Sequence, residues 1–152
     1  MPPAETLVVD ASVAVKWNLG DEEHADKATL LLTRFSEGKT DLLAPDYIRY
    51  EVPSAITVAT QGRGPRIAQD QGKEAIEEFL NLGVRTMDSS ELILEAYPLV
   101  HQYGCALYDA LYLALAQRLT LPFITADFKL YRRIRHLPGV VWIGDYSPVD
   151  GE

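Results

Sequence analysis

The chain has 152 residues, a length typical of one domain, and we expect a single domain over residues 1–152. Its 47% hydrophobic and 24% charged residues are globular proportions, which exclude a disordered or fibrous chain. The formal net charge of −8 argues against a strongly basic nucleic-acid-binding surface, but it leaves room for a metal-dependent enzyme that acts on a polyanion.

The first half of the chain alternates short apolar runs with amphipathic segments. The run 6–9 predicts a buried strand, and the apolar spacing over 21–37 predicts a helix that stops at Gly38. A second strand is expected at 42–44. Asp46 can cap the next helix, whose apolar stripe comprises Ile48, Val52, Ala55, Ile56 and Ala59. After a Gly- and Pro-rich break, another helix is expected over 67–82.

The second half repeats this alternation. A strand is expected at 84–87, followed by a helix that begins at Ser89 or Ser90 and is kinked or split by Pro98. Residues 107–119 are apolar on almost every face, which predicts a deeply buried helix. Two strands and a short basic helix complete the pattern, at 123–125, 140–143 and 128–135. Alternating strands and helices predict a three-layer α/β/α sandwich around a mostly parallel sheet.

Two features of the sequence indicate the cellular compartment in which the protein works. The first residues lack the basic and apolar regions of a signal peptide, and the stretch 96–117 holds Pro98 and Asp109, which predicts protein interior and no membrane association. A single cysteine, Cys105, excludes an intrachain disulfide framework and a cysteine-rich zinc site. Both observations favour a reducing, cytoplasmic setting. The tail from Asp145 to Glu152 carries little pattern, and we expect a free acidic end.

Four acidic residues occupy positions at which they could bind a metal ion or take part in catalysis. Asp10 and Asp127 each follow a predicted strand, so parallel strands would bring both to one edge of the sheet, although each could equally cap the helix that follows. Asp109 lies in the first turn of the most apolar helix, where the helix dipole stabilises a carboxylate by only about 0.3–1 kcal/mol. Glu51 borders an apolar stripe and could instead be a surface residue.

Carboxylates that converge repel one another, so such a cluster needs protons or a cation. Oxygen ligands without a histidine or cysteine set favour Mg²⁺ or Mn²⁺ over zinc. Two such ions about 3.5–4 Å apart can generate hydroxide and stabilise the leaving oxygen of a phosphodiester. Bound ions would also reverse the local sign of charge, which allows an acidic protein to bind RNA.

The sequence resembles the PIN-domain nucleases, in particular the VapC-type toxins of toxin–antitoxin pairs. The resemblance rests on four segments that occur in the family's order and cover nearly the whole chain: Val8–Trp17, Tyr50–Ala55, Tyr108–Ala116 and Thr125–Asp127. The family's second motif commonly has Asn where this chain has Ser54. The residue three positions before the Asp of its third motif is commonly Ser or Thr, and here it is Ala106. Neither departure removes an acidic residue, so they bear on rate and substrate preference more than on the reaction.

The resemblance implies a metal-dependent endoribonuclease with a two-metal-type mechanism. It makes Asp10, Glu51, Asp109 and Asp127 the catalytic, metal-binding acids, with Mg²⁺ or Mn²⁺ as cofactor, and Ser12 and Thr125 the supporting hydroxyl groups. It also implies an RNA substrate, a VapB-type antitoxin partner and a homodimer.

The sequence also leaves a basic surface and two other functions open. The basic face after Asp127, with Lys129, Arg132 and Arg133, could contact phosphates or could be an ordinary solvated surface. A catalytically degenerate PIN-like binding module is the first alternative. A haloacid-dehalogenase-like phosphatase is less well supported, because that chemistry needs Asp-x-Asp and position 12 is a serine.

Overall fold

The computed structural model describes residues 2–150, whose strands form one all-parallel sheet in the order β3-β2-β1-β4-β5. The strands are β1 (Glu5–Val9), β2 (Thr40–Pro45), β3 (Arg85–Met87), β4 (Phe123–Thr125) and β5 (Val140–Trp142). The α-helices are α1 (Ala11–Ala14), α2 (Ala25–Ser36), α3 (Ile48–Ala59), α4 (Gln69–Asn81), α5 (Ile93–Tyr103), α6 (Leu107–Leu119) and α7 (Phe128–Ile134). Three 3-10 turns complete the chain: η1 (Val15–Trp17), η2 (Ser89–Leu92) and η3 (Ile143–Asp145).

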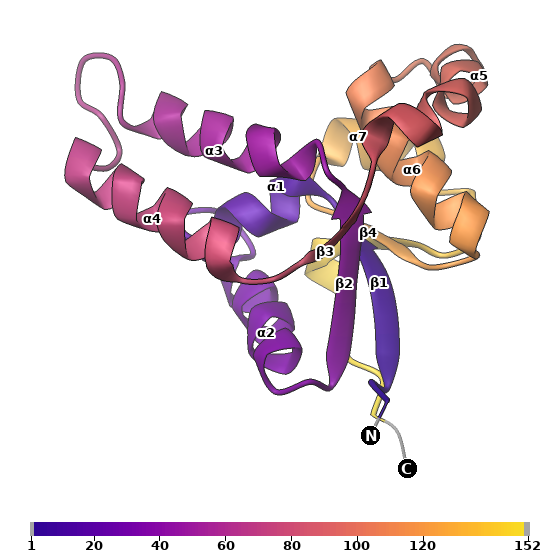
Figure 1. The fold of residues 1–152 in the computed structure, drawn as a ribbon, viewed down its shortest axis with the longest axis horizontal. Coiled ribbons are helices and arrows are strands. Elements are labelled where there is room, and N and C mark those ends of the chain that lie inside the picture. Colours follow the sequence, from indigo (N-terminus) through magenta and orange to yellow (C-terminus); the bar gives the residue numbers. More distant parts are fainter. Residues whose placement is uncertain (1, 151–152) are drawn as a thin grey trace.

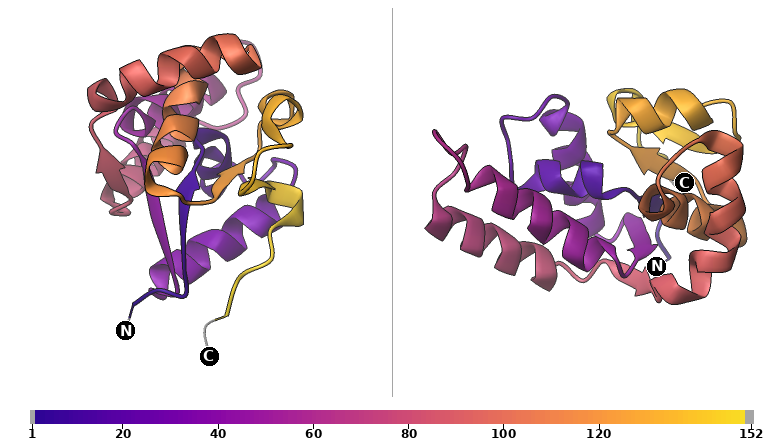
Figure 2. Two further views of the ribbon diagram at one scale, coloured as in Figure 1. Left: turned by 90° about the vertical axis from the view of Figure 1, so that its right-hand side faces the viewer. Right: turned by 90° about the horizontal axis from the view of Figure 1, so that it is seen from above.

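Helices cover both sides of the sheet, which confirms the predicted three-layer architecture. In Figure 1, α2 and the α3–α4 pair lie to the left of strands β1 and β2, and α5 and α6 lie to the right. Helix α6 contacts β1, β2 and β4, and every residue from Ala110 to Ala116 is buried, as its uniformly apolar sequence predicts. Helix α5 packs against α6, and Figure 2 (left) shows it crossing the upper end of that helix. Among the helices of residues 2–150, none is both long and apolar enough to cross a bilayer.

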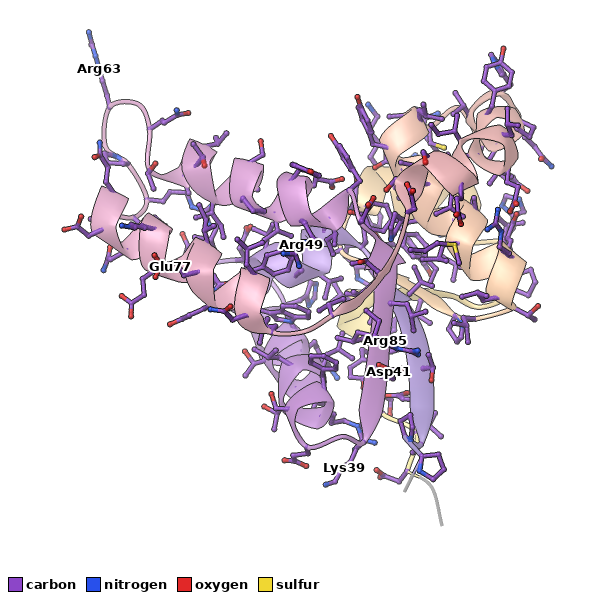
Figure 3. All side chains as sticks on the ribbon, viewed as in Figure 1. Lys39, Asp41, Arg49, Arg63, Glu77 and Arg85 are labelled. Carbon is purple, nitrogen blue, oxygen red and sulfur yellow. The ribbon has the colours of Figure 1, made fainter. Side chains whose placement is uncertain are left out.

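The strand register determines what lies at the carboxyl edge of the sheet. Val9 of β1 pairs with Ile124 of β4, and the amide of Asp10 donates to the Ile124 carbonyl at 3.0 Å. The residues that follow these two strands are therefore neighbours at one edge, where parallel sheets commonly bind ligands. On the other side of β1, Asp41 of β2 forms an ion pair with Arg85 of β3 (Figure 3), which adds a polar contact between those strands.

Three local predictions were wrong in detail. Asp46 does not cap α3; its Oδ1 instead accepts hydrogen bonds from the backbone and hydroxyl of Ser89, at 2.9 and 2.6 Å, so a distant segment competes for the carboxylate. Helix α5 continues through the exposed Pro98, so the expected split is wrong, and a kink at this residue stays a prediction. Helix α2 begins at Ala25 rather than near Asp21, because His24 adopts a left-handed conformation with φ of 62°.

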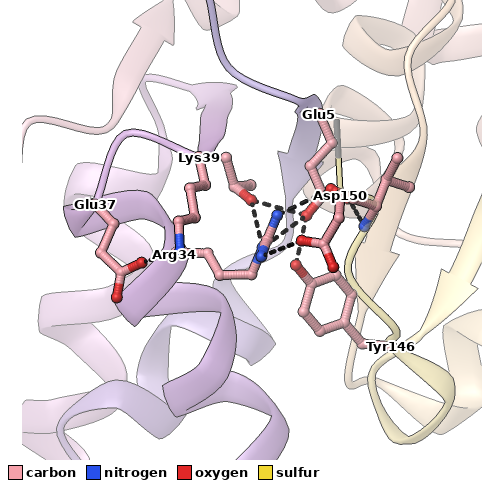
Figure 4. A network of polar contacts seen from close by, with 8 residues as sticks. Glu5, Arg34, Glu37, Lys39, Tyr146 and Asp150 are labelled. Carbon is pink, nitrogen blue, oxygen red and sulfur yellow. Dashed lines mark hydrogen bonds and ion pairs between the residues drawn. The ribbon is translucent and has the colours of Figure 1, made fainter. Parts of the chain in front are cut away.

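The segment after β5 returns to the amino end of the sheet, where a polar network holds it (Figure 4). The buried Arg34 donates to Asp150 at 2.9 Å and to the Val149 carbonyl at 2.9 Å. The Tyr146 hydroxyl donates to Glu5 Oε1 at 2.5 Å, which links this segment to β1. The expectation of a free acidic end is therefore wrong as far as residue 150, because Arg34 and Glu5 bind this segment. Residues 151 and 152 lie outside the described residues.

Candidate active site

Asp10 lies at the centre of the carboxyl edge and is only 2% exposed. It follows β1 directly and stands at the N-cap position of α1, yet its side chain makes no capping hydrogen bond. Its Oδ2 instead accepts hydrogen bonds from the hydroxyl groups of Ser12, at 2.6 Å, and Thr125, at 2.7 Å. Because both hydroxyls donate to the same oxygen, Oδ1 remains available for another partner. The side chain is therefore oriented toward the site and not toward its own helix.

Ser12 and Thr125 also organise the loop that follows β4. The backbone amide of Ala126 donates to Ser12 Oγ at 2.9 Å, and that of Asp127 donates to Thr125 Oγ1 at 3.1 Å. Each hydroxyl thus uses its single proton on Asp10 and its lone pairs on the loop amides. This arrangement joins the ends of β1 and β4 and sets the position of Asp127 relative to Asp10.

Glu51 approaches the same place from the first turn of α3, as a half-buried residue. The hydroxyl of the fully buried Tyr112 donates to its Oε1 at 3.3 Å. Burial and the neighbouring carboxylates raise the pKa of Tyr112 far above its usual value, so the phenol remains a hydrogen-bond donor at any physiological pH. Tyr112 consequently limits where the Glu51 carboxyl group can lie.

Asp109 and Asp127 complete the group of acids. Asp109 lies in the first turn of α6, half-buried, where a hydrogen bond to the backbone of Ala106 partly offsets the effect of burial on its pKa. Asp127 caps α7, because its Oδ1 accepts from the Leu130 amide at 3.1 Å. The capping interpretation therefore describes Asp127 but not Asp10. Asp109 and Asp127 both line a cavity of about 250 Å³.

The four carboxylates are close enough to influence one another electrostatically. Burial, followed by the charges of Asp109 and Asp127, raises the pKa of Asp10 to about 6, although its two hydroxyl donors oppose the rise. Burial and the charges of Asp10, Asp109 and Asp127 raise the pKa of Glu51 to about 8. Burial and the charge of Asp127 raise the pKa of Asp109 as well. Their convergence therefore costs free energy while no cation compensates their charge.

These carboxylates fit a hard divalent cation in their donor chemistry, because oxygen ligands predominate in Mg²⁺ and Mn²⁺ sites. They are not arranged as a finished coordination sphere: within residues 2–150, no three His, Cys, Asp or Glu side chains form a cluster that could hold a metal ion. Burial, followed by the charges of neighbouring acids, raises the pKa values of Asp10 and Glu51, and a bound cation would favour their ionised forms.

A basic surface borders the acids on the side of α7. Lys129 and Arg133 line the same cavity as Asp109 and Asp127. Together with Phe128 and Arg132 they also line an adjacent cavity of about 420 Å³. All three basic residues of this face are exposed, as expected either for a phosphate-binding surface or for a solvated helix.

Sequence reasoning missed the position of Tyr112. Its hydroxyl contacts Glu51, a role that the apolar character of the helix does not indicate. The available signal was its spacing, since a residue three positions after Asp109 shares that face of the helix. Of the two departures from the family's motifs, Ala106 stands at the N-cap of α6 and provides no side-chain cap, and Ser54 is exposed on α3.

Comparison with known proteins adds independent information. Residues 7–136 match the PIN domain family. The chain is 27% identical over 126 residues to Ribonuclease VapC3 of Pyrobaculum aerophilum, an alignment that covers 82% of this chain and 91% of that protein.

Solved structures show the same fold at low sequence identity. The VapC20 toxin of Mycobacterium tuberculosis, described as cleaving the sarcin–ricin loop, superposes with a TM-score of 0.59 at 14% identity, covering 81% of this chain and 92% of that one. A toxin–antitoxin complex from Klebsiella pneumoniae has a TM-score of 0.57 at 18% identity, with coverages of 89% and 95%. VapBC2 of Rickettsia felis, bound to promoter DNA, also has a TM-score of 0.57, at 12% identity and coverages of 90% and 96%. The match over most of the chain, together with this fold, establishes that the chain belongs to the PIN domain family.

Proposed function

We propose that this chain is an endoribonuclease that hydrolyses RNA phosphodiester bonds with Mg²⁺ or Mn²⁺, and that it is the toxin of a toxin–antitoxin pair. One observation carries the proposal: acids from β1, α3, α6 and the end of β4 gather at a single edge of the sheet. The relative named as a ribonuclease supports the reaction class.

Asp10, Glu51, Asp109 and Asp127 would hold the metal. When bound, divalent ions supply positive charge that polarises the phosphate and lowers the pKa of an attacking water. Every other contribution comes from the chain itself. Two hydroxyl donors hold Asp10 with its Oδ1 free, and the Asp127 amide bond to Thr125 holds the fourth acid beside it.

Glu51 has a distinct role in this scheme. With a pKa of about 8, its carboxyl group keeps its proton at neutral pH while no cation is near, and it ionises when positive charge enters the site. Tyr112 keeps the carboxyl group in position in both protonation states, because its hydroxyl can donate to either. Glu51, whose ionisation is opposed by burial and by the other acids, is thus already in position to bind a cation.

The basic face of α7 would bind the RNA backbone beside the cleaved bond. Lys129 and Arg133 share a cavity with Asp109 and Asp127, so a phosphate there would lie next to the acids. Arg132 extends the positive surface along the helix. Cationic side chains at such positions orient a nucleic acid without reading its sequence.

Two partners follow from the same proposal. Solved complexes of toxin with antitoxin share this fold, which supports a VapB-type antitoxin that binds this chain. The homodimer rests on family resemblance, and light scattering coupled to size-exclusion chromatography would give its mass directly.

The deciding experiment compares RNA cleavage by the parent protein with that by Asp10→Asn and Asp109→Asn, in EDTA and then in Mg²⁺ or Mn²⁺. We expect metal-dependent cleavage by the parent and its loss in both variants, with thermal unfolding showing that each is folded. Asp70→Asn, an exposed residue on α4, is the matched control and should cleave normally. Full activity in both site variants would overturn the assignment.

The same experiment separates the alternatives. A non-cleaving PIN-like module would show no cleavage by the parent protein and no heat of Mg²⁺ or Mn²⁺ binding in a calorimetric titration. The phosphatase alternative gains no support from the structure, because Ser12 occupies the position of the second acid and its hydroxyl is bound to Asp10.

A further inference from the structure

Two tyrosines form a parallel stack beside the acids. Tyr47, at the start of α3, and Tyr108, in the first turn of α6, have ring centroids 4.3 Å apart and ring planes inclined by 6°. Tyr108 is 53% exposed, whereas Tyr47 is half-buried. A ring that is covered on one face by a parallel neighbour and is still half exposed presents its other face to solvent.

The stack is tied to the acids through both helices. Tyr108 immediately precedes Asp109, and Tyr47 lies one helical turn before Glu51. The environment confirms this proximity: burial, followed by the charges of Tyr108 and Glu51, raises the pKa of Tyr47. The stack therefore lies at the start of the two helices that carry Glu51 and Asp109.

The basic residues border Asp109 as well, in a cavity of their own. The cavity with Lys129 and Arg133 is lined by Asp109 and Asp127, and neither tyrosine contributes to it. An aromatic surface and a cationic surface thus flank the same acids. A single strand of nucleic acid can contact both surfaces, because its bases stack on aromatic rings and its phosphates pair with cations.

We propose that Tyr108, supported from behind by Tyr47, is a stacking platform for a nucleobase next to the cleaved phosphate. The inference rests on the proposed ribonuclease function and names the chemistry of its substrate contact: an unpaired base of single-stranded RNA. Tyr47 holds the ring of Tyr108 in one orientation, which reduces the entropy lost when a base stacks on it. Stacking tolerates every base. Purines have the larger π surface, so we expect a modest preference for purines at this position.

The platform is tested by binding and by cleavage, with Tyr108→Leu and Tyr108→Phe. Binding is measured in an Asp10→Asn background with Mn²⁺, using a single-stranded 12-nucleotide RNA that contains 2-aminopurine, whose fluorescence is quenched by stacking. Cleavage is measured in the otherwise unchanged protein with a random-sequence pool of the same length, and cut sites are sequenced. Tyr97→Leu is the matched control, because Tyr97 is 61% exposed on α5.

We expect Tyr108→Leu to weaken binding roughly 5- to 150-fold, the range for one base on one aromatic ring, and to lose quenching. The loss in cleavage should lie mainly in KM, with the purine preference reduced. Tyr108→Phe should retain binding and quenching, because it keeps the ring, and Tyr97→Leu should behave as the parent.

The outcomes separate this inference from the proposed function. If the parent protein cleaves no RNA, the proposed function fails, and the binding arm still decides whether Tyr108 stacks a base. If the parent cleaves but Tyr108→Leu binds, quenches and selects cut sites as the parent does, the platform is refuted alone. Loss of binding in Tyr108→Phe as well would also overturn it, because a hydroxyl contact and not the ring would then be responsible.

Discussion

Replacing Glu51 by glutamine should stabilise the metal-free protein. Glu51 has a pKa of about 8 in the folded chain against an ordinary value of 4.5. At pH 7 this group is ionised in the unfolded chain and protonated in the folded chain, so folding takes up one proton. The pH lies about 2.5 units above the unfolded pKa of 4.5, which makes that uptake unfavourable. At 1.36 kcal/mol per unit, that uptake costs about 3 kcal/mol. Glutamine has the shape of the protonated acid and escapes this cost, while its amide oxygen can still accept from Tyr112.

The pH dependence has a definite sign. The folded pKa is the higher one, so the group's contribution to stability is complete below pH 4.5 and is lost as the pH rises toward 8. The parent protein should therefore lose stability over this range in EDTA, and Glu51→Gln should lose less. Asp10, with its pKa raised to about 6, contributes a smaller loss of the same sign at lower pH.

Thermal and urea unfolding at pH 5, 7 and 8 in EDTA measure the effect. A gain of about 2–3 kcal/mol at pH 7 corresponds to about 5–10 °C in Tm for a chain of this size. Glu77→Gln, on the exposed side of α4 (Figure 3), is the control and should change stability by less than about 0.5 kcal/mol. In saturating Mg²⁺ the parent should gain more stability than Glu51→Gln. Equal stability of parent and Glu51→Gln in EDTA, with equal pH slopes, would refute the reasoning.

Three further changes probe separate parts of the molecule. Thr125→Val removes a donor to Asp10 while keeping its buried shape, so the Mg²⁺ concentration for half-maximal cleavage should rise roughly 10- to 100-fold, as is typical when a ligand loses its supporting hydrogen bond. Tyr146→Phe deletes the bond to Glu5 and should cost about 1–2 kcal/mol in urea unfolding. Ile56→Ala, fully buried in α3, should cost about 2–5 kcal/mol with metal affinity of the folded protein unchanged. A shift of metal affinity with Ile56→Ala, or none with Thr125→Val, would contradict this division of roles.

Elements with strong periodicity were predictable from the sequence because local hydrophobic pattern decides them. The range of α6 was predicted to the residue, since an almost wholly apolar segment can only be a buried helix. The parallel order of the strands follows from helical connections between them. That order brings acids after β1 and β4 to one edge; which of them bind metal, and the single-domain organisation, stay predictions.

Contacts between distant segments were not predictable from a single sequence. Asp46 has the ordinary signature of a helix cap, but its partner is Ser89, 43 residues away. The sequence pattern places Arg34 on the polar face of an amphipathic helix, yet the residue is buried and binds Asp150, 116 residues away. Local patterns carry no information about such partners, and the same limit hid the contact of Tyr112 with Glu51.

The polar network at the amino end of the sheet has a consequence for engineering the chain. Val149 lies against Glu5, with its amide 3.4 Å from Glu5 Oε2, so the end of the described chain lies beside the start of β1. A short peptide could therefore join residue 150 to residue 2 without crossing the carboxyl edge of the sheet, where the acids lie. The exposed loop at 61–66, where Arg63 points outward (Figure 3), offers the new break point. Such a circular permutant would carry its fusion partners at the far tip of the α3–α4 hairpin.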